Sequence, residues 1–406
     1  MNLQLRPTTT VEAEETLEDL AEELEIPPYR YEQAEASYKS LGRWLSRVNS
    51  SIRQYGPQVH VQGSFGLGTV IPPIADDEHY DVDAVCEFCK LTKGQLSQQE
   101  LKRLLGHEIK LYAASQIMTK PVEERRRCWM LVYADGAQFH MDITPGIPNA
   151  TEQRALLAKR GLDASLADTA VAITDIDHPF YKVVSNDWPR SNPRGYLKWF
   201  HSRMAKIFEE RKKALMQKGA RAGTEPIPDY EVRTPLQSAI MILKRHRDIM
   251  FIDRFDERPI SIILTTLAAH SYIGENKIAD ALFAILSQMD RFIMRQPDGT
   301  LLIANPSDPS ENFADKWKRH PERAAAFFEW LQRAREEDFA RAAALSNTQL
   351  ITDNLAKGIG TDLAERVKKR ATRRLGAPAV LTGGLIRSEA QARSSAVQLQ
   401  GDRRNA

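Results

Sequence analysis

Apolar residues recur every three or four positions near the start of the chain, which is the spacing of helices. The stretch TTTVEAEETLEDLAEELEI offers threonines as N-caps and acids for a first turn, so it predicts a helix, which the prolines at 27–28 end. A longer amphipathic helix is predicted from about Glu32 to Gln54. Its apolar face would consist of Ala34, Tyr38, Leu41, Leu45, Val48 and Ile52.

A period of two replaces this spacing between residues 57 and 148, and it predicts strands. Residues 57–63, PQVHVQG, alternate and would form a strand that ends at Gly63. Residues 80–89, YDVDAVCEFC, alternate between apolar side chains and a series that includes acids. Residues 125–148 predict a hairpin around the turn ADG.

After about residue 190 the hydrophobic pattern is that of helices. We expect helices at 194–218, 234–250, 259–273, 276–293 and 310–344. The composition of residues 217–229, QKGARAGTEPIPD, predicts a flexible loop.

These patterns predict an α+β protein with two lobes, for which 406 residues are enough. Residues 1–190 would form an N-terminal lobe with the long helix and a mixed sheet, and residues 191–375 a helical lobe. Beyond Gly376 large apolar residues become rare, so residues 376–406 are expected to be a disordered tail.

The composition, 42% apolar and 27% charged residues, is that of a soluble globular protein. No apolar run approaches a membrane span, and the acidic N-terminus does not resemble a signal peptide. Three cysteines, an odd number, argue against a disulfide framework, so we expect a cytoplasmic protein.

The net charge of +2 is unevenly distributed, since residues 366–406 carry +8 and the rest of the chain −6. A mildly acidic body is unlike a nucleic-acid clamp, so any contact with phosphates must be local.

Three aspartates carry the strongest chemical signal. Asp81 and Asp83, two positions apart on a strand, point to the same face. Such carboxylates repel each other unless a cation lies between them, and Asp142 lies on a later strand that could pair alongside. The three acids predict a site for two Mg²⁺ ions, with Mn²⁺ as a substitute. One ion would activate an attacking hydroxyl, and the other would neutralise a triphosphate leaving group.

The pair Gly63-Ser64 lies where a strand ends and a helix can begin, so that free N–H groups attract phosphate. Glycine permits close approach of the backbone, and the serine hydroxyl adds a donor. A lone Gly-Ser is usually a turn, and a lone Asp-x-Asp is usually a solvated strand face. Their joint order, followed by a strand with Asp142, is selective, and it predicts a cradle for a triphosphate.

Seven motifs together resemble one protein family. QGSFGLGT, YDVD and FHMDITPG resemble the catalytic segments of the DNA polymerase beta nucleotidyltransferase superfamily. SNPRGYLKWF, LQSAIMILKRHRD, RPISIILTTLAAHSY and NPSDPSENFADKW narrow the resemblance to the cGAS/DncV-like nucleotidyltransferases (CD-NTases), the oligonucleotide cyclases of bacterial CBASS anti-phage defence. The likeness covers roughly residues 30–345. It implies a Pol-beta-like core, a C-terminal helical lobe and an active site in the cleft between them.

Members of this family join nucleoside triphosphates, here ATP and/or GTP, into cyclic di- or trinucleotides that activate an effector. The resemblance implies that Asp81, Asp83 and Asp142 are catalytic residues and metal ligands, with Asp142 best placed to help as general base. The nucleotide-binding residues that it implies are Gln62, Gly63, Ser64, Lys244 and Ser261.

Some of these assignments have plain alternatives. Lys244 could lie on a solvated helix face, and Ser261 could simply be the first residue of a helix. Ile262 stands where some relatives carry an aromatic residue that stacks on a base. Stacking would then fall to another aromatic residue, and the candidates are Tyr80, Tyr196 and Trp199.

Other signals are weaker. The C-x₂-C of CEFC can ligate zinc, but residues three apart on a strand face opposite ways, so core packing is favoured. His140 could line the cleft or serve a structural role. ERVKKRATRRL is either a solvated helix end or a contact for RNA or DNA. The tail ending QGDRRNA either has no role or is attached to targets by CBASS conjugation enzymes, as the resemblance implies.

Two other functions stay open. One is a template-independent transferase that adds nucleotides to RNA or to a protein hydroxyl, and the other is an inactive nucleotide sensor. We expect no membrane partner and an effector reached only through the product. The bases joined, the linkage, the ring size and any nucleic-acid activator remain undecided.

Overall fold

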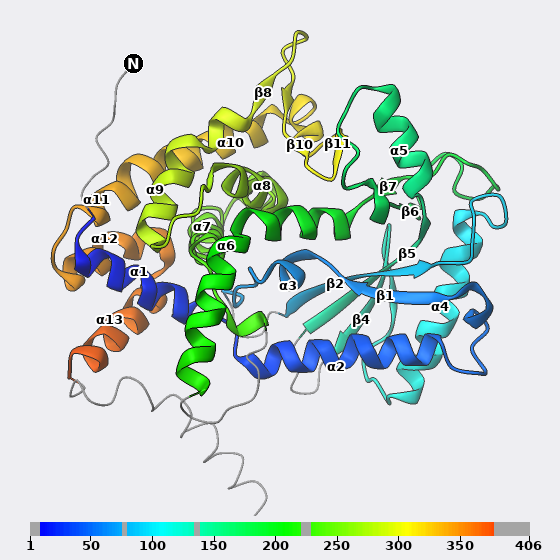
Figure 1. The fold of residues 1–406 in the computed structure, drawn as a ribbon, viewed down its shortest axis with the longest axis horizontal. Helices are drawn as coiled ribbons and strands as arrows, with labels where there is room; N and C mark the ends of the chain where they lie inside the picture. Colours follow the sequence, from blue (N-terminus) through cyan, green and yellow to red (C-terminus); the bar gives the residue numbers. More distant parts are fainter. Residues whose placement is uncertain (1–8, 75–78, 134–138, 221–228, 377–406) are drawn as a thin grey trace, which may run out of the picture.

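The computed structural model describes residues 9–74, 79–133, 139–220 and 229–376. One part of it is built around a sheet (Figure 1). Its elements are α2 (Pro28–Leu45), β1 (Pro57–Val61), α3 (Gly63–Leu67), β2 (Tyr80–Phe88), α4 (Gln98–Ser115), β3 (Glu123–Glu124), β4 (Trp129–Tyr133), β5 (Phe139–Pro148), α5 (Ala150–Lys159), β6 (Val171–Ile173) and β7 (Arg190–Ser191).

The other part is helical, with two small hairpins. Its elements are α1 (Val11–Glu23), α6 (Pro193–Ala220), α7 (Pro235–Met250), α8 (Ser261–Ser271), α9 (Ile278–Gln288), β8 (Met294–Arg295), β9 (Leu301–Leu302), β10 (Ala304–Asn305), β11 (Asp308–Asn312), α10 (Pro321–Gln332), α11 (Phe339–Ala343), α12 (Thr348–Ile359) and α13 (Thr361–Gly376). This mixed sheet with a helical lobe confirms the predicted α+β class.

The sheet has the strand order β1-β2-β5-β4-β3, and β6 and β7 continue from the far end of β5. Strand β2 runs antiparallel to β1 and parallel to β5, and β5 runs antiparallel to β4. The register between β2 and β5 pairs Asp83 with Asp142 and Asp81 with His140.

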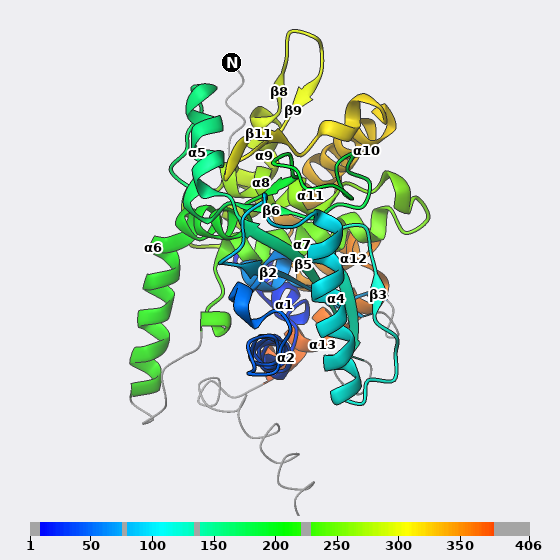
Figure 2. The same ribbon diagram turned by 90° about the vertical axis from the view of Figure 1, so that its right-hand side faces the viewer.

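One face of the sheet is the apolar core of this lobe. Val82 and Cys86 of β2 lie there in one buried cluster with Leu41 of α2 and with Leu101 and Leu105 of α4. Figure 2 shows α2 nearly end-on and α4 beside the strands. Because side chains alternate along a strand, the aspartates of β2 lie on the opposite face.

The second predicted helix is shorter than expected. Pro28 is the first residue of α2, where its missing N–H costs nothing, so the proline pair separates two helices as predicted. The helix ends at Leu45 instead of near Gln54, and Val48 is 78% exposed. Ile52 is buried all the same, because the chain turns back through the short 3₁₀ helix Arg53–Tyr55.

The three strands and the hairpin pairing of β4 with β5 are confirmed, while the hairpin's turn (134–138) lies outside the described residues. Helices α6, α7, α8 and α9 lie where helices were predicted. The predicted loop 217–229 is helical up to Ala220, and 221–228 lie outside the described residues. The predicted helix 310–344 is wrong at its start, because Asp308–Asn312 pairs with β10 and the helix begins only at Pro321.

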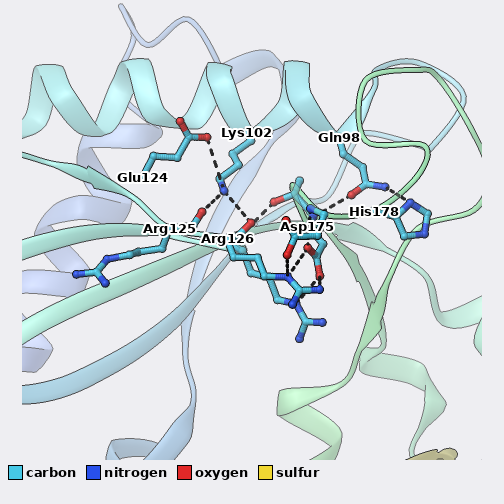
Figure 3. A network of polar contacts seen from close by, with 10 residues as sticks. Gln98, Lys102, Glu124, Arg125, Arg126, Asp175 and His178 are labelled. Carbon is cyan, nitrogen blue, oxygen red and sulfur yellow. Dashed lines mark hydrogen bonds and ion pairs between the residues drawn. The ribbon is translucent and has the colours of Figure 1, made fainter. Parts of the chain in front are cut away.

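Helix α4 was not predicted, and polar contacts hold it to the segment between β3 and β4 (Figure 3). The Lys102 ammonium donates to the backbone carbonyls of Arg125 and Arg126, and the Gln98 amide oxygen accepts from the N–H of Asp175. Although burial raises the pKa of Asp175, hydrogen bonds from Arg126 and Arg127 lower it to about 2. Through Lys102 the network joins α4 to the segment between β3 and β4, and through Gln98 it joins α4 to the segment at Asp175.

Helix α1 lies among the C-terminal helices, not with the sheet. Figure 1 shows it in blue beside the orange helices α12 and α13. Its apolar residues Leu17 and Leu20 belong to the same buried cluster as Leu355 of α12 and Val367 of α13. The predicted boundary at residue 190 therefore does not describe where α1 packs.

The basic stretch ERVKKRATRRL forms part of α13, and three of its arginines face α1. Arg366 pairs with Glu23, Arg370 with Glu22, Glu23 and Asp19, and Arg374 with Glu15 and Asp19. This face is a contact between two helices, so these arginines are not simply solvated. The predicted tail lies outside the described residues from position 377 onward.

Within the described ranges, none of the helices combines the length and the apolar character needed to cross a membrane.

Candidate active site

Gly63 places the backbone of its turn directly against Asp83. The N–H of Gln62, the N-cap of α3, donates to the backbone carbonyl of Asp83 at 2.8 Å, so the chain stays paired with β2 up to the turn. Gly63 itself has φ +63°, and a Cβ added there would lie 2.1 Å from Oδ2 of Asp83. The left-handed conformation and this close approach both require glycine.

The register places Asp83 beside Asp142, and Asp81 lies on the same face of the sheet, which α2 and α4 leave uncovered. The side chain of Asp81 is 82% exposed, whereas Oδ1 of Asp142 is buried and has no hydrogen-bond partner among the described residues. Burial, Asp142 and Asp81 raise the pKa of Asp83 to about 6, and burial and Asp142 raise that of Asp81. The carboxylates thus repel each other at close range.

The acids suit a hard divalent cation. Across the part of the chain that the structure describes, no three His, Cys, Asp or Glu side chains already surround a common metal position. The donor set nevertheless consists of carboxylate oxygens, one of them buried without a partner, and their mutual repulsion is what a bound cation relieves. These residues fit Mg²⁺.

His140 lies on the acid face, opposite Asp81 in the register. Its Nδ1 is 3.8 Å from Oδ1 of Asp81, and its Nε2 shares a hydrogen bond of 2.7 Å with Nδ1 of His79. Of the two interpretations of His140, the one that places it beside the acids agrees with this geometry.

Lys244 lies on α7 and reaches the loop that follows α3. It is buried, so the alternative of a solvated helix face is wrong for this residue. Its Nζ donates to the carbonyl of Thr69 at 2.9 Å. Burial, with a contribution from Arg247, lowers the pKa of Lys244 to about 7 despite nearby Asp83. Lys244, which was predicted to contact phosphate, therefore lies near the acids, but in this structure its ammonium group binds a backbone carbonyl.

Ser64 and Ser261 lie in different surroundings. Ser64 is half-buried in α3, and its carbonyl accepts from the N–H of Thr69 at 2.9 Å. Ser261 is the first residue of α8, and its hydroxyl accepts from Nη1 of Arg247 at 2.9 Å. Arg247 lies one helical turn after Lys244, so this serine is linked to the same helix.

None of the three aromatic candidates for base stacking presents its ring on the acid face. Tyr80 lies on the same face of β2 as Val82 and packs against the core. Tyr196 is buried, and its hydroxyl is hydrogen-bonded to Thr266 at 2.8 Å. Trp199 packs on His270, near the end of α8 that lies away from Ser261; the ring centroids are 4.8 Å apart.

Among the described residues, the cysteines take part in no cluster that could bind zinc. Cys86 is buried in the core cluster, as predicted, but the prediction of core packing is wrong for Cys89, which follows the end of β2 and is exposed. Cys128 is buried next to Asp142, and burial and this carboxylate raise the pKa of its thiol to about 12. The thiol is therefore protonated at neutral pH.

A cavity of about 560 Å³ lies behind the Gly63 turn and not at the acids. It is lined by Phe65, Gly66 and Gly68, by Tyr31 of α2 and by Val82 from the core face of β2. Val82 and the aspartates point to opposite faces of one strand, so this cavity is separate from the candidate active site.

Two residues that were not predicted, Arg233 and Gln237, contact the segment after the turn. Their side chains bond to carbonyls at Gly68 and Leu67. The pattern Thr-x-x-Gln at 234–237 is a capping-box signature, which signals a helix start. It carries no sign of a contact about 170 positions away.

Comparison with known proteins agrees with this geometry. Residues 57–145 match the family profile described as cyclic GMP-AMP synthase DncV-like, nucleotidyltransferase domain. The chain is 28% identical to a c-di-GMP synthase of Roseivirga ehrenbergii, over 80% of this chain and 78% of the relative. It is 25% identical to the cyclic dinucleotide synthase CdnG of Bradyrhizobium diazoefficiens, over 74% and 69%.

The fold is similar to that of a solved structure as well. The structure of Bradyrhizobium diazoefficiens CdnG in complex with GTP superposes with a TM-score of 0.66 at 20% identity, covering 89% of this chain and 99% of the other. The matched profile spans β1 to β5, the segment that contains the Gly63 turn and all three aspartates.

Proposed function

Because this chain is a nucleotidyltransferase of the cGAS/DncV-like (CD-NTase) family, we propose that it condenses nucleoside triphosphates into a cyclic dinucleotide. The observation that carries the proposal is the register of β2 and β5, which sets Asp83 beside Asp142 and next to the Gly63 turn. The relatives named as c-di-GMP synthase and cyclic dinucleotide synthase, the latter solved with GTP, favour GTP as the first substrate.

In this proposal the Gly63-Ser64 turn, with Gln62 before it, holds the triphosphate, and the three aspartates hold Mg²⁺. The metal would supply charge neutralisation and activation of the attacking hydroxyl. A ribose hydroxyl of one nucleotide attacks the α-phosphate of the other, and the bond to pyrophosphate breaks. The proton passes to a carboxylate, for which Asp142 with its unpartnered Oδ1 is the proposed base. A second such transfer closes the ring.

The helical lobe would contact the far end of the triphosphate. Lys244 lies near enough to Asp83 for their charges to interact, and Ser261 is linked to the same helix through Arg247. We propose that Lys244 exchanges its bond to the Thr69 carbonyl for a phosphate oxygen when nucleotide binds.

Incubation of the purified chain with radiolabelled GTP, alone and with each other NTP, in Mg²⁺ and without RNA tests the function. We expect pyrophosphate release and a phosphatase-resistant product, whose mass gives the bases and ring size. The double variant Asp81→Asn/Asp83→Asn should make no product, and its melting temperature should be equal or higher, because repulsion between the carboxylates is relieved.

A matched control changes two exposed acids, Asp253→Asn/Asp256→Asn, and should retain activity. Phosphatase-sensitive chains that grow on added RNA would instead indicate the template-independent transferase. If the wild-type chain releases no pyrophosphate with any NTP in Mg²⁺ or Mn²⁺, the proposed function is wrong.

We further propose that the product acts in anti-phage defence by activating a separate effector. Attachment of the C-terminus by CBASS conjugation enzymes remains a prediction, since residues 377–406 lie outside the described part of the chain. Intact-mass measurement of the protein co-expressed with the neighbouring genes of its operon tests it.

A further inference from the structure

Three consecutive backbone carbonyls after the Gly63 turn are bound by three side chains of the helical lobe. Nε2 of Gln237 donates to the carbonyl of Leu67 at 2.9 Å. Nη1 of Arg233 donates to that of Gly68 at 2.7 Å, and Nζ of Lys244 to that of Thr69 at 2.9 Å. We call Gln237, Arg233 and Lys244 the carbonyl clamp.

The middle residue of the clamped segment, Gly68, has no space for a side chain. Gly68 has φ +65°, and a Cβ there would lie 2.5 Å from Nε2 of Gln237 and 3.0 Å from Nη1 of Arg233. A side chain at this position would therefore push both donors away from the carbonyls. Glycine here serves the contact with the clamp, as Gly63 serves the contact with Asp83.

The clamp residues are themselves held in place. The amide oxygen of Gln237 accepts from the N–H of Thr234 at 3.0 Å, completing the capping box of α7, so only its NH₂ group points to Leu67. Arg233 also donates to the hydroxyl of Tyr31 at 2.8 Å and pairs with Glu25 at 3.2 Å. Rotation of either side chain would break bonds at both of its ends.

The clamp connects directly to the predicted phosphate-binding turn. The N–H of Thr69 donates to the carbonyl of Ser64 at 2.9 Å, so the segment that Lys244 holds is bonded back to the serine. Helix α3 has only five residues, too few to be rigid alone. External bonds must therefore fix its orientation.

We propose that Gln237 and Arg233 are positioning residues, which orient the Gly63-Ser64 turn for the triphosphate through the clamp. This inference rests on the proposed function, because it assumes that the turn binds nucleotide. Affinity for the triphosphate then depends on the helical lobe as well as on the sheet.

A pair of variants separates positioning from mere stability. Gln237→Glu keeps an acceptor for the capping box, where glutamate is a usual partner, but turns a carboxylate oxygen toward the Leu67 carbonyl. Thr234→Ala removes the capping hydroxyl, which also donates to Oε1 of Gln237, but it keeps the Thr234 N–H that holds this oxygen. Kinetics with NTP, Kd for GTP and melting temperature are measured for both.

We expect Gln237→Glu to raise KM and Kd by about tenfold, the effect of one lost hydrogen bond, with a smaller change in kcat. Thr234→Ala should lower the melting temperature and leave KM within about twofold of wild type. Arg233→Lys, which keeps the charge and one donor, should shift KM in the same direction by less. If Gln237→Glu and Thr234→Ala both lower the melting temperature and neither changes KM or Kd, the proposal is wrong.

Amide hydrogen exchange of residues 62–70 separates a failure of this inference from a failure of the proposed function. Without nucleotide, Gln237→Glu should speed exchange in this segment, and Thr234→Ala should not. If wild type binds no GTP, the proposed function fails, and the exchange data alone decide whether the clamp orders the turn. Unchanged exchange in Gln237→Glu would overturn the clamp even in an active enzyme.

Discussion

Gly63 lies where the backbone of the turn comes closest to the acid cluster. A Cβ at this position would have to share space with Oδ2 of Asp83, 2.1 Å away. Gly161 has nearly the same backbone conformation, φ +65°, but an added Cβ there would meet no described atom within 4 Å. The two glycines therefore separate backbone strain from the displacement of Asp83.

We expect Gly161→Ala to cost about 1 kcal/mol in the free energy of unfolding and to leave activity unchanged. Gly63→Ala should bear the same strain and also displace Asp83, so its kcat should fall by about a hundredfold or more. Cyclase kinetics and denaturant unfolding of both variants measure this. A Gly63→Ala enzyme as active as Gly161→Ala would mean that the close approach has no catalytic role.

His270 makes the stability of the helical lobe depend on pH. Its ring lies 4.8 Å from that of Trp199 and stacks on Phe292 at 5.1 Å. Burial, with a contribution from Arg203, lowers its pKa from 6.5 to about 4. Between these two values the unfolded chain binds a proton that the folded chain does not, so this residue reduces stability as the pH falls from 6.5 toward 4.

The variant His270→Phe keeps an aromatic ring and cannot take up the proton. Its melting temperature should fall less than that of wild type as the pH decreases from neutral to about 4, and the two should differ by a constant amount above pH 7. The exposed His107, changed to Gln, is the control and should leave the profile as in wild type. Parallel curves for His270→Phe and wild type would contradict the assignment.

The strands show what alternation predicts and what it leaves open. The period of two indicated that Asp81 and Asp83 share a face, because that depends only on neighbouring residues. The parallel pairing of β2 with β5 cannot be predicted from the sequence of either strand alone, since β5 also pairs with β4. The order of the strands in the sheet depends on how all of them pack over one core. That Asp142 lies beside Asp83 was inferred from the resemblance and from the possibility of pairing.

Helices with a continuous apolar stripe were predicted best. Helix α4 was not predicted because its buried face includes the polar residues Gln98, Lys102 and Glu108, whose hydrogen-bond partners lie far along the chain. The end of β11, residues 310–312, was included in a predicted helix because this strand is short and too polar to show a period. The clamp residues were missed for the same reason, since their value lies in bonds to residues about 170 positions away.

The contact between α1 and α13 is mainly electrostatic on its outer side. The single side chain of Arg370 pairs with three acids of α1, Asp19, Glu22 and Glu23. Arg370→Glu should therefore lower the free energy of unfolding by about 1–2 kcal/mol, since it removes a small network and adds repulsion. The neighbouring exposed Lys369→Glu makes the same change of charge and should have little effect.

Urea unfolding in low and high salt measures this difference. High salt screens exposed charges, so the gap between Arg370→Glu and Lys369→Glu should narrow there. A gap that is absent in low salt would mean that the ion pairs contribute nothing to the contact.

The two lobes divide the work of the proposed reaction. The sheet supplies the three carboxylates and the turn, whereas the helical lobe supplies the clamp and the cations of α7. The composition and patterns indicated two lobes, but they assigned α1 to the wrong one, because an amphipathic helix does not record which partner covers its apolar face. Only the assembled core decides that.

The place of α1 has a consequence for the order in which the protein is made. This helix is synthesised before the sheet, but the helices that cover it, α12 and α13, are synthesised only after the sheet. The core of the helical lobe therefore cannot be completed before α13 has been synthesised. A nascent chain that already contains the whole sheet still lacks a finished helical lobe, so the proposed nucleotide transfer is disfavoured until α13 has folded against α1.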